Sequence, residues 1–444
     1  MKLIYSTGFL IFLLLFSQGC EDIVGGDINR DPNNPTAVPV SAQLPAFQIA
    51  LADEYGGLFS RFNGLLVQQV EGVARQWSSL NSYTGLTPNR YDASWNNIYE
   101  NVLNELHVAR ATSIAQGFNH FEGIIDIMEA FTMMMATDVW DDIPYSEAVQ
   151  GVGNINPKFD AQSKIYTAIN MLLDNGISKL SGAAGGVAPG SKDVYYGGDV
   201  ENWIRAAHAI KARGMLHNKN YSGAMSEAMS SFGGAAENLG YQYPDANSGG
   251  PWYRFNDGRT GDIEFHPTMK KIMTDLNDMD RLSVIDVIFV TDASYTASHP
   301  FIRPDYFQEL VTYREMQFII AESDVRNGGT QLGYDAYLAG IKASFEKFGL
   351  GDAEYDAYTA QTEINPGLGS LTLEHVMIQK YIGLYLQPEV YNDYRRTNIP
   401  ELDPVSGPNV PVRWAIPQTE VLFNSNAPAA GSINVFTDRV GWNR

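Results

Sequence analysis

The sequence is poor in cysteine and in positive charge. Cys20 is its single cysteine, so no intramolecular disulfide can form and a zinc site built on several cysteines is impossible. Thirty lysines and arginines stand against 51 aspartates and glutamates, which gives a formal net charge of -21. A field of that sign repels phosphate backbones and anionic lipid headgroups, so nucleic acid is disfavoured as a partner. The fold must be held together by packing.

Long apolar runs are also scarce. After residue 20 no segment is long and charge-free enough to span a bilayer, which takes about 20 residues. The main apolar stretch is Leu3–Phe16, which follows Lys2 and precedes the cysteine. Its uninterrupted part, Phe9–Phe16, is too short for a membrane helix. This layout is typical of a secretory signal.

The residues around Cys20 resemble the lipobox of bacterial lipoproteins, in which a small residue precedes a cysteine that is acylated after cleavage. Gly19 fits this pattern, whereas Ser17 stands where leucine is usual. We therefore predict a signal peptide over 1–19, a lipidated flexible tether over 20–42 and a single domain over 43–444. The alternatives are an ordinary signal peptide with an incidental cysteine and a retained membrane helix.

From about residue 43 onward, apolar residues recur at helical spacing. In the segment 92–113, with Asp92 as the expected N-cap, they form one face: Trp95, Ile98, Tyr99, Val102, Leu103 and Leu106. The segment 119–140 repeats the pattern, and the polar residues between the two segments predict an antiparallel hairpin. The same period predicts further helices at roughly 163–180, 201–217, 221–232, 267–277, 313–326, 333–348 and 372–387.

Several of these helices come in pairs. The segment 313–349 resembles a tetratricopeptide unit, in which Gly328 and Gly329 would end the first helix. Such units stack into a curved scaffold. Long irregular tracts rich in aromatic residues lie between the pairs, notably 80–91 and 241–265. We predict an all-α fold, a tetratricopeptide-like helical-pair scaffold with long irregular ligand-binding loops.

The patterns of common catalytic and metal sites are missing. The sequence has no GxSxG, HExxH or GxxxxGKS motif. His208 and His217 lie on one helical segment, where such histidines more often pack or face solvent than bind metal. The acidic stretch 275–278 lacks the glycine and glutamate of an EF-hand. We expect no metal and no other cofactor.

Three carboxylates, Asp138, Asp141 and Asp142, crowd the segment "ATDVWDDIPYSEA". A glycosidase would need two such groups on either side of a scissile bond. Here they lie at a predicted helix end beside Pro144, where carboxylates usually accept hydrogen bonds from the backbone. We favour this structural role and predict that the protein is not an enzyme, with a surface glycoside hydrolase as an alternative.

Aromatic residues in two irregular regions are the best candidates for a ligand site. A Trp or Tyr ring offers a flat apolar platform for a sugar ring, and neighbouring amide or carboxylate groups can bind hydroxyls. The alternative is that these rings fix the loops onto the helices. The predicted ligand-binding residues are Trp77, Asn81, Tyr83, Trp252, Tyr253 and Asp257.

The order of several segments resembles the SusD/RagB family of nutrient-binding outer-membrane lipoproteins of Bacteroidota. After the lipobox come "WNNIYENVLNEL", "DVWDDIPYSEA", "IYTAINMLLDNGISKL", "WIRAAHAIKARGML", "YREMQFIIAES", "YNDYRRTNIPEL" and "RWAIPQTEVLFN". The resemblance covers nearly the whole chain. It implies an all-helical fold with four tetratricopeptide-like pairs, and a ligand surface near the two aromatic regions named above.

The resemblance also implies a function. Such proteins are lipid-anchored on the extracellular face of the outer membrane, capture oligosaccharides and deliver them to a SusC-type TonB-dependent transporter. We therefore predict a glycan-binding lipoprotein with that partner and location. Peptide capture by the same architecture and a purely adhesive helical scaffold are the alternatives.

Overall fold

The computed structural model describes residues 38–287, 289 and 299–444. The predicted signal peptide, Cys20 and most of the predicted tether lie outside the described residues. The described chain is helical from its start, because helix α2 (Val40–Glu54) already buries Val40. This helix begins three residues before the predicted start of the domain.

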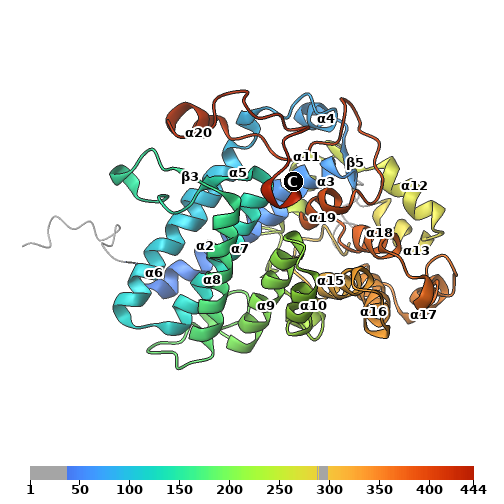
Figure 1. Cartoon of the computed structure of the whole chain (residues 1–444), viewed down its shortest axis with the longest axis horizontal. Helices are drawn as coiled ribbons and strands as arrows, with labels where there is room; N and C mark the ends of the chain where they lie inside the picture. The colour runs from blue at the N-terminus through green and yellow to red at the C-terminus, as the bar shows by residue number, and fades with distance from the viewer. Residues whose placement is uncertain (1–37, 288, 290–298) are drawn as a thin grey trace, which may run out of the picture.

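The fold is mostly helical, and the predicted fold class is confirmed (Figure 1). After α2, the helices are α3 (Ser60–Leu66), α4 (Arg75–Asn81), α5 (Asp92–Asn96), α6 (Asn104–Gln116), α7 (Asn119–Trp140), α8 (Gln162–Leu180), α9 (Val200–His217), α10 (Tyr221–Met229), α11 (Pro251–Arg259), α12 (Pro267–Asp275), α13 (Met279–Ile285), α15 (Tyr313–Arg326), α16 (Gln331–Lys347), α17 (Asp352–Thr359), α18 (Leu373–Gly383), α19 (Glu389–Thr397) and α20 (Gln418–Phe423).

The strands are short and form antiparallel pairs. β1 (Val70–Gly72) pairs with β5 (Ile263–Phe265), β2 (Ile143–Pro144) with β3 (Phe159–Asp160), and β4 (Leu239–Gln242) with β6 (Phe307–Val311). Each pair joins segments that are distant in the sequence or flank a loop. The strands therefore fasten the irregular tracts to the helical scaffold.

Helices that follow one another along the chain pack in pairs, α7 with α8, α9 with α10 and α15 with α16. Glycine lets α7 and α8 approach closely, since a Cβ at Gly123 would lie 2.7 Å from Leu180 Cγ. The end of α15 uses glycine for a different reason. Gly328 and Gly329 have positive φ angles of 115° and 73°, a backbone region that favours glycine. The predicted end of this helix is confirmed.

The helix expected over 92–113 is continuous, but it passes through a π-helical turn, η3 (Asn97–Leu103), between α5 and α6. The prediction that Asp92 caps this helix is wrong, because Asp92 is its first residue and makes no cap. Instead, Asp92 Oδ1 accepts hydrogen bonds from the backbone N–H and the hydroxyl of Thr419. It thereby pairs with a backbone N–H in the first turn of α20, a helix more than 300 residues away.

The second tract expected to be irregular contains a helix. Pro251 opens α11 at a position where its missing N–H costs nothing, and Trp252 lies on the buried face of the same helix. The polar composition of this segment hid the helical period.

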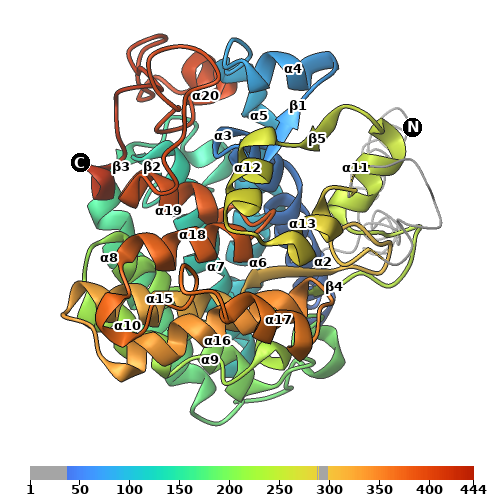
Figure 2. The same cartoon turned by 90° about the vertical axis from the view of Figure 1, so that its right-hand side faces the viewer.

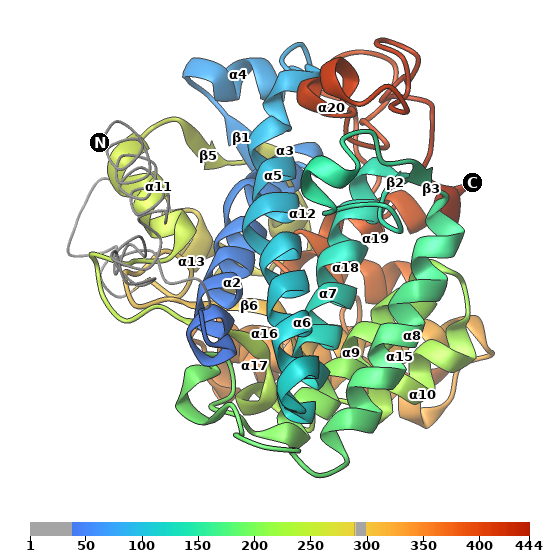
Figure 3. The same ribbon diagram turned by 90° about the vertical axis from the view of Figure 1, so that its left-hand side faces the viewer.

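Two further observations concern membrane crossing and the arrangement of elements at one end of the molecule. Among the described residues, no helix combines the length and apolar character that crossing a bilayer requires. Figures 1, 2 and 3 show α4, α20 and the long C-terminal loops at one end of the molecule, while the paired helices α9, α10, α15 and α16 lie away from it. We call the former the loop end.

Candidate functional site

The loop end contains the first of the two predicted aromatic regions. Trp77 and Asn81 lie on α4 and Tyr83 follows it. The 3-10 turn η2 (Pro88–Arg90) comes next and packs against α20. Tyr83 also contacts the C-terminal tract, since its ring centroid lies 6.2 Å from that of Phe436.

The two predicted regions meet through a shared aromatic cluster. The Phe255 ring of α11 packs edge-on against Trp77, with centroids 5.2 Å apart, and contacts Trp252 at 6.0 Å. Arg61 inserts among them, with its guanidinium carbon 4.8 Å from the Phe255 centroid and 5.8 Å from each tryptophan. The two predicted regions are therefore neighbours in space, although they are distant in the sequence.

The same cluster hides the predicted platforms. Trp77 is 4% exposed, Trp252 is 2% and Tyr83 is 5%. The Trp252 Nε1 group is occupied as well, because it donates to the hydroxyl of Ser60 at 2.8 Å. A ring that is covered on both faces cannot stack on a sugar. The expectation that these three rings are open platforms is wrong, and they fix the two tracts onto the scaffold.

The remaining predicted residues reach the surface. Asn81 and Tyr253 are half-buried and Asp257 is exposed. Asp257 makes no ion pair among the described residues. Ligand contact by Asn81, Tyr253 and Asp257 stays a prediction.

An apolar groove of about 750 Å³ lies at the loop end beside α20. One wall is formed by residues 86–89, and the other by residues from the tract 415–436, including Val421, Leu422 and Phe436. Leu422 is 63% exposed, although it is a large apolar residue. The sequence reading did not identify this tract as part of a site. Its one local signal is the adjacent Leu422 and Phe423 in a stretch otherwise rich in small and polar residues.

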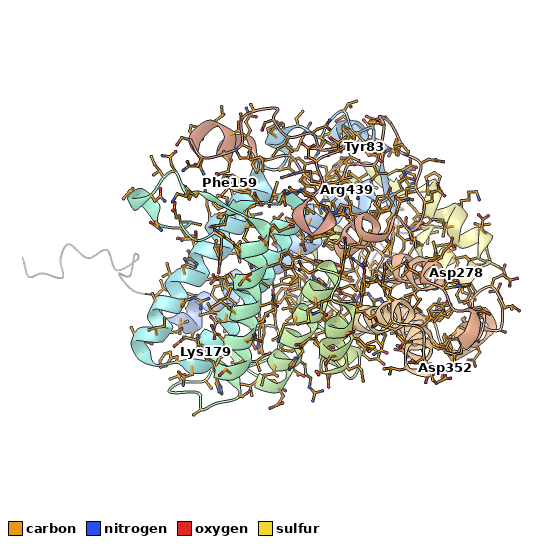
Figure 4. All side chains as sticks on the ribbon, viewed as in Figure 1. Tyr83, Phe159, Lys179, Asp278, Asp352 and Arg439 are labelled. Atoms are coloured by element: carbon orange, nitrogen blue, oxygen red, sulfur yellow. The ribbon has the colours of Figure 1, made fainter. Side chains whose placement is uncertain are left out.

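A second hollow, of about 380 Å³, adjoins the groove because Phe436 lines both. We call it the Arg439 pocket. Its lining combines two rings with amide, hydroxyl and guanidinium groups, chiefly those of Tyr394, Asn398, Asn409, Phe436, Thr437 and Arg439. Figure 4 shows Arg439 and Tyr83 at this same end.

A third hollow, of about 360 Å³, lies on the other side of α20. Trp95, Tyr99 and Phe423 line it together with Asn96 and Glu100. Trp95 is 4% exposed, in line with its predicted core position, whereas Phe423 is 76% exposed. The short helix α20 therefore divides two hollows and offers an apolar side chain to each.

The three carboxylates that prompted the glycosidase alternative are engaged in structural contacts. Asp142 Oδ1 accepts from the backbone N–H of Gln162 at 2.9 Å. Asp141 is buried and accepts from the backbone N–H of Gly441, with Arg413 and Arg444 beside it. These contacts agree with the structural role that we predicted.

The third carboxylate, Asp138, belongs to a buried set that we call the His217 network: Asp138, Tyr166, His217, Glu389 and Trp442. His217 Nε2 bonds Glu389 at 2.6 Å, and its Nδ1 bonds the Tyr166 hydroxyl at 2.8 Å. That hydroxyl and the Trp442 Nε1 group both donate to Asp138. The Trp442 ring also stacks on His217, with centroids 5.1 Å apart.

The His217 network resembles a metal site in composition, because ligand atoms of Asp138, His217 and Glu389 lie within 4.8 Å of one another. Burial alone would lower the pKa of His217, but Glu389 and Asp138 raise it to about 9. The raised pKa favours the protonated imidazole, whose charge the two carboxylates balance. These residues form an ion-pair network. His208, on the same helix, pairs separately with Glu227.

Solved structures share this fold. A SusD/RagB family protein from Bacteroides thetaiotaomicron matches with a TM-score of 0.76 and 20% identity, over 92% of this chain and 99% of that one. A SusD homologue from Bacteroides fragilis gives 0.74 and 18%, over 92% and 100%. A chitin-binding SusD homologue from Flavobacterium johnsoniae gives 0.72 and 19%, over 91% and 98%.

The sequence comparisons differ in outcome. No curated protein matches the sequence. The family model SusD-like, described as "Starch-binding associating with outer membrane", matches residues 32–417, which is most of the chain. The matched region spans the helical pairs, the aromatic cluster and part of the groove wall. The chain therefore belongs to the SusD-like family of outer-membrane-associated binding proteins.

Proposed function

We propose that this protein captures an oligosaccharide at the cell surface and delivers it to a SusC-type TonB-dependent transporter. The observation that carries the proposal is the joined pair of hollows at the loop end, where apolar walls and rings adjoin amide and hydroxyl groups. Sugars need both, because each ring has apolar C–H faces and a rim of hydroxyls. The chitin-binding SusD homologue among the structural neighbours supports a glycan over a peptide.

The proposal assigns binding and no catalysis. Of the three candidate carboxylates, Asp138 and Asp141 are buried and bonded, and the Asp142 contact organises the start of α8. The family model that matches this chain describes binding proteins. Incubation with polysaccharides should release no new reducing ends, and sustained release would contradict this assignment.

Phe436 offers the sharpest binding test, because its ring lines both hollows. We expect Phe436→Ala to weaken oligosaccharide binding by roughly 10-fold, the loss of about 1.4 kcal/mol of contact. Isothermal titration against a panel of neutral and acidic oligosaccharides, with short peptides as a further arm, would measure this. Binding of peptides alone would replace the glycan proposal by the peptide alternative.

Tyr253→Ala tests the rival location on α11, where the sequence predicts a ligand contact. This side chain is half-buried on α11, so its removal tests the predicted contacts of that tract without emptying the core. A loss for Tyr253→Ala with full binding by Phe436→Ala would move the site from the hollows to α11. Unchanged affinity in both variants would remove both locations.

The anchor and the transporter are further parts of the proposal. Acylation of Cys20 would hold the protein on the membrane without a spanning helix, since several acyl chains bury enough methylene groups for permanent attachment. Mass spectrometry of the native protein should show an acylated Cys20 at the mature amino terminus. Purification from outer membranes should recover a large barrel protein with it. Recovery of an unacylated protein, or of no barrel protein, would contradict these parts.

A further inference from the structure

Among the described residues, Arg439 has no partner for its charge. In the part of the chain that the structure describes, Arg90 and Arg439 are the arginines whose guanidinium groups make neither an ion pair nor a hydrogen bond. The other described arginines donate to a carboxylate or to a carbonyl, as Arg395 does. Both exceptions lie at the loop end, Arg90 at the end of η2 and Arg439 in the pocket.

The pocket around Arg439 lacks the opposite charge. None of the described residues that line it is an aspartate or a glutamate, in a chain that has 51 acidic residues against 30 basic ones. Three acids close to the pocket in the sequence, Glu401, Asp403 and Asp438, lie outside this lining. Asp438 accepts from the backbone N–H of Asn434 and from Thr437. Glu401 is exposed. Burial is the main cause that raises the pKa of Tyr394, and the nearby Glu401 charge raises it further.

The pocket is lined by two arginines, Arg395 and Arg439, and Arg439 is the one available to a ligand. Arg395 is 4% exposed and donates to the backbone oxygens of Asp138 and Val412 and to Asn392. Its guanidinium is therefore committed to holding α19 against the end of α7. Arg439 is exposed and can turn its planar group toward a ligand.

We propose that the Arg439 pocket binds the carboxylate of a hexuronic acid unit, so that the captured oligosaccharide is an acidic one. This inference rests on the proposed function. A guanidinium binds a carboxylate through two parallel N–H···O bonds, which fixes orientation as well as affinity. The half-buried Phe436 ring flanks the sugar, and the exposed Asn398 and Asn409 amides bind its hydroxyls. The net negative charge of the protein is overridden locally by this acid-free lining.

The test uses a matched pair of ligands and a matched pair of variants. An oligogalacturonide and its methyl ester differ in charge and have the same sugar rings. We expect the acid to bind at least about 10-fold more tightly than the ester, and Arg439→Gln to abolish this difference by weakening the acid alone. Lys192→Gln removes one charge from an exposed lysine elsewhere and should preserve the difference.

Each outcome is decisive. Equal binding of acid and ester, or an acid preference that survives Arg439→Gln, would overturn the inference and leave the proposed function standing. Tighter binding of a sulfated oligosaccharide than of any uronic acid would also overturn it. Failure of every acidic and neutral oligosaccharide to bind would overturn the proposed function itself. Acid binding that weakens as salt rises, with Arg439→Gln insensitive to salt, would support the inference.

Discussion

The His217 network and the Arg439 pocket both combine aromatic rings with charged groups, and Arg395 contacts both. In the network the groups are buried and each charge meets its opposite. In the pocket the polar side chains of Asn398, Asn409, Thr437 and Arg439 are exposed, and the Arg439 guanidinium meets no described partner. The comparison teaches that rings and charged groups occur together both in a structural cluster and in a candidate binding site. Pairing and exposure separate them.

Breaking the network should have the largest effect. Glu389→Ala leaves the protonated His217 buried with one of its two carboxylates gone, and loss of one partner from a buried ion pair costs roughly 3–5 kcal/mol. Urea unfolding followed by circular dichroism would measure the loss. Glu346 is exposed on α16, so Glu346→Ala is the control and should change stability by less than about 0.5 kcal/mol. Equal losses of unfolding free energy in the two variants would mean that Glu389 in the network stabilises the fold no more than an exposed carboxylate does.

Emptying the aromatic cluster should come next. Trp252→Ala removes a ring that is 2% exposed and leaves a cavity beside Arg61, at an expected cost of about 3 kcal/mol. Oligosaccharide affinity measured on the folded variant should stay within about 2-fold of the original, since the ring is covered. A large loss of affinity with little loss of stability would return Trp252 to the binding site.

Raising the pH should weaken the network by a smaller amount. His217 has a pKa of about 9 in the folded protein against an ordinary value of 6.5, so folding favours its protonated form. The resulting stability is fully present below about pH 6.5 and is lost as the pH rises through about 9. The difference in unfolding free energy between the original protein and His217→Gln should therefore shrink between about pH 6 and about pH 9.5. A constant difference would show that the histidine is neutral when buried.

The smallest effect is expected at the pocket. Arg439→Gln changes an exposed, unpaired side chain, so the unfolding free energy should shift by less than about 0.5 kcal/mol. Thermal unfolding of the free variant would measure this. A loss above about 1 kcal/mol would show that Arg439 holds the C-terminal tract in place and would remove the contrast with the network.

Much of the fold could be predicted because helical periodicity is local. The bounds of α15 agree with the prediction over 313–326, and α7 agrees over 119–140. The period fails in α11, where polar residues surround the few that are buried. Helical periodicity also cannot show that Asp92 accepts a hydrogen bond from Thr419 of α20, because that contact joins residues more than 300 positions apart.

The candidate site was harder to predict for a related reason. An aromatic residue in a loop can face the ligand or the core, and Trp77 and Trp252 face the core. The Arg439 pocket collects residues from α19, the loop after it and the last part of the chain, with no motif in any of them. Only the tertiary structure reveals that no described carboxylate forms an ion pair with Arg439 there.

The position of Trp442 has a consequence for how the protein is made. Its indole closes the His217 network, yet it lies beyond residue 417, where the family match ends. Asp138, His217 and Glu389 all precede this ring in the chain, so the network cannot close until nearly the whole chain has been made. A recombinant fragment trimmed to the family boundary would stop at that unfinished stage, with a charged interior open to water.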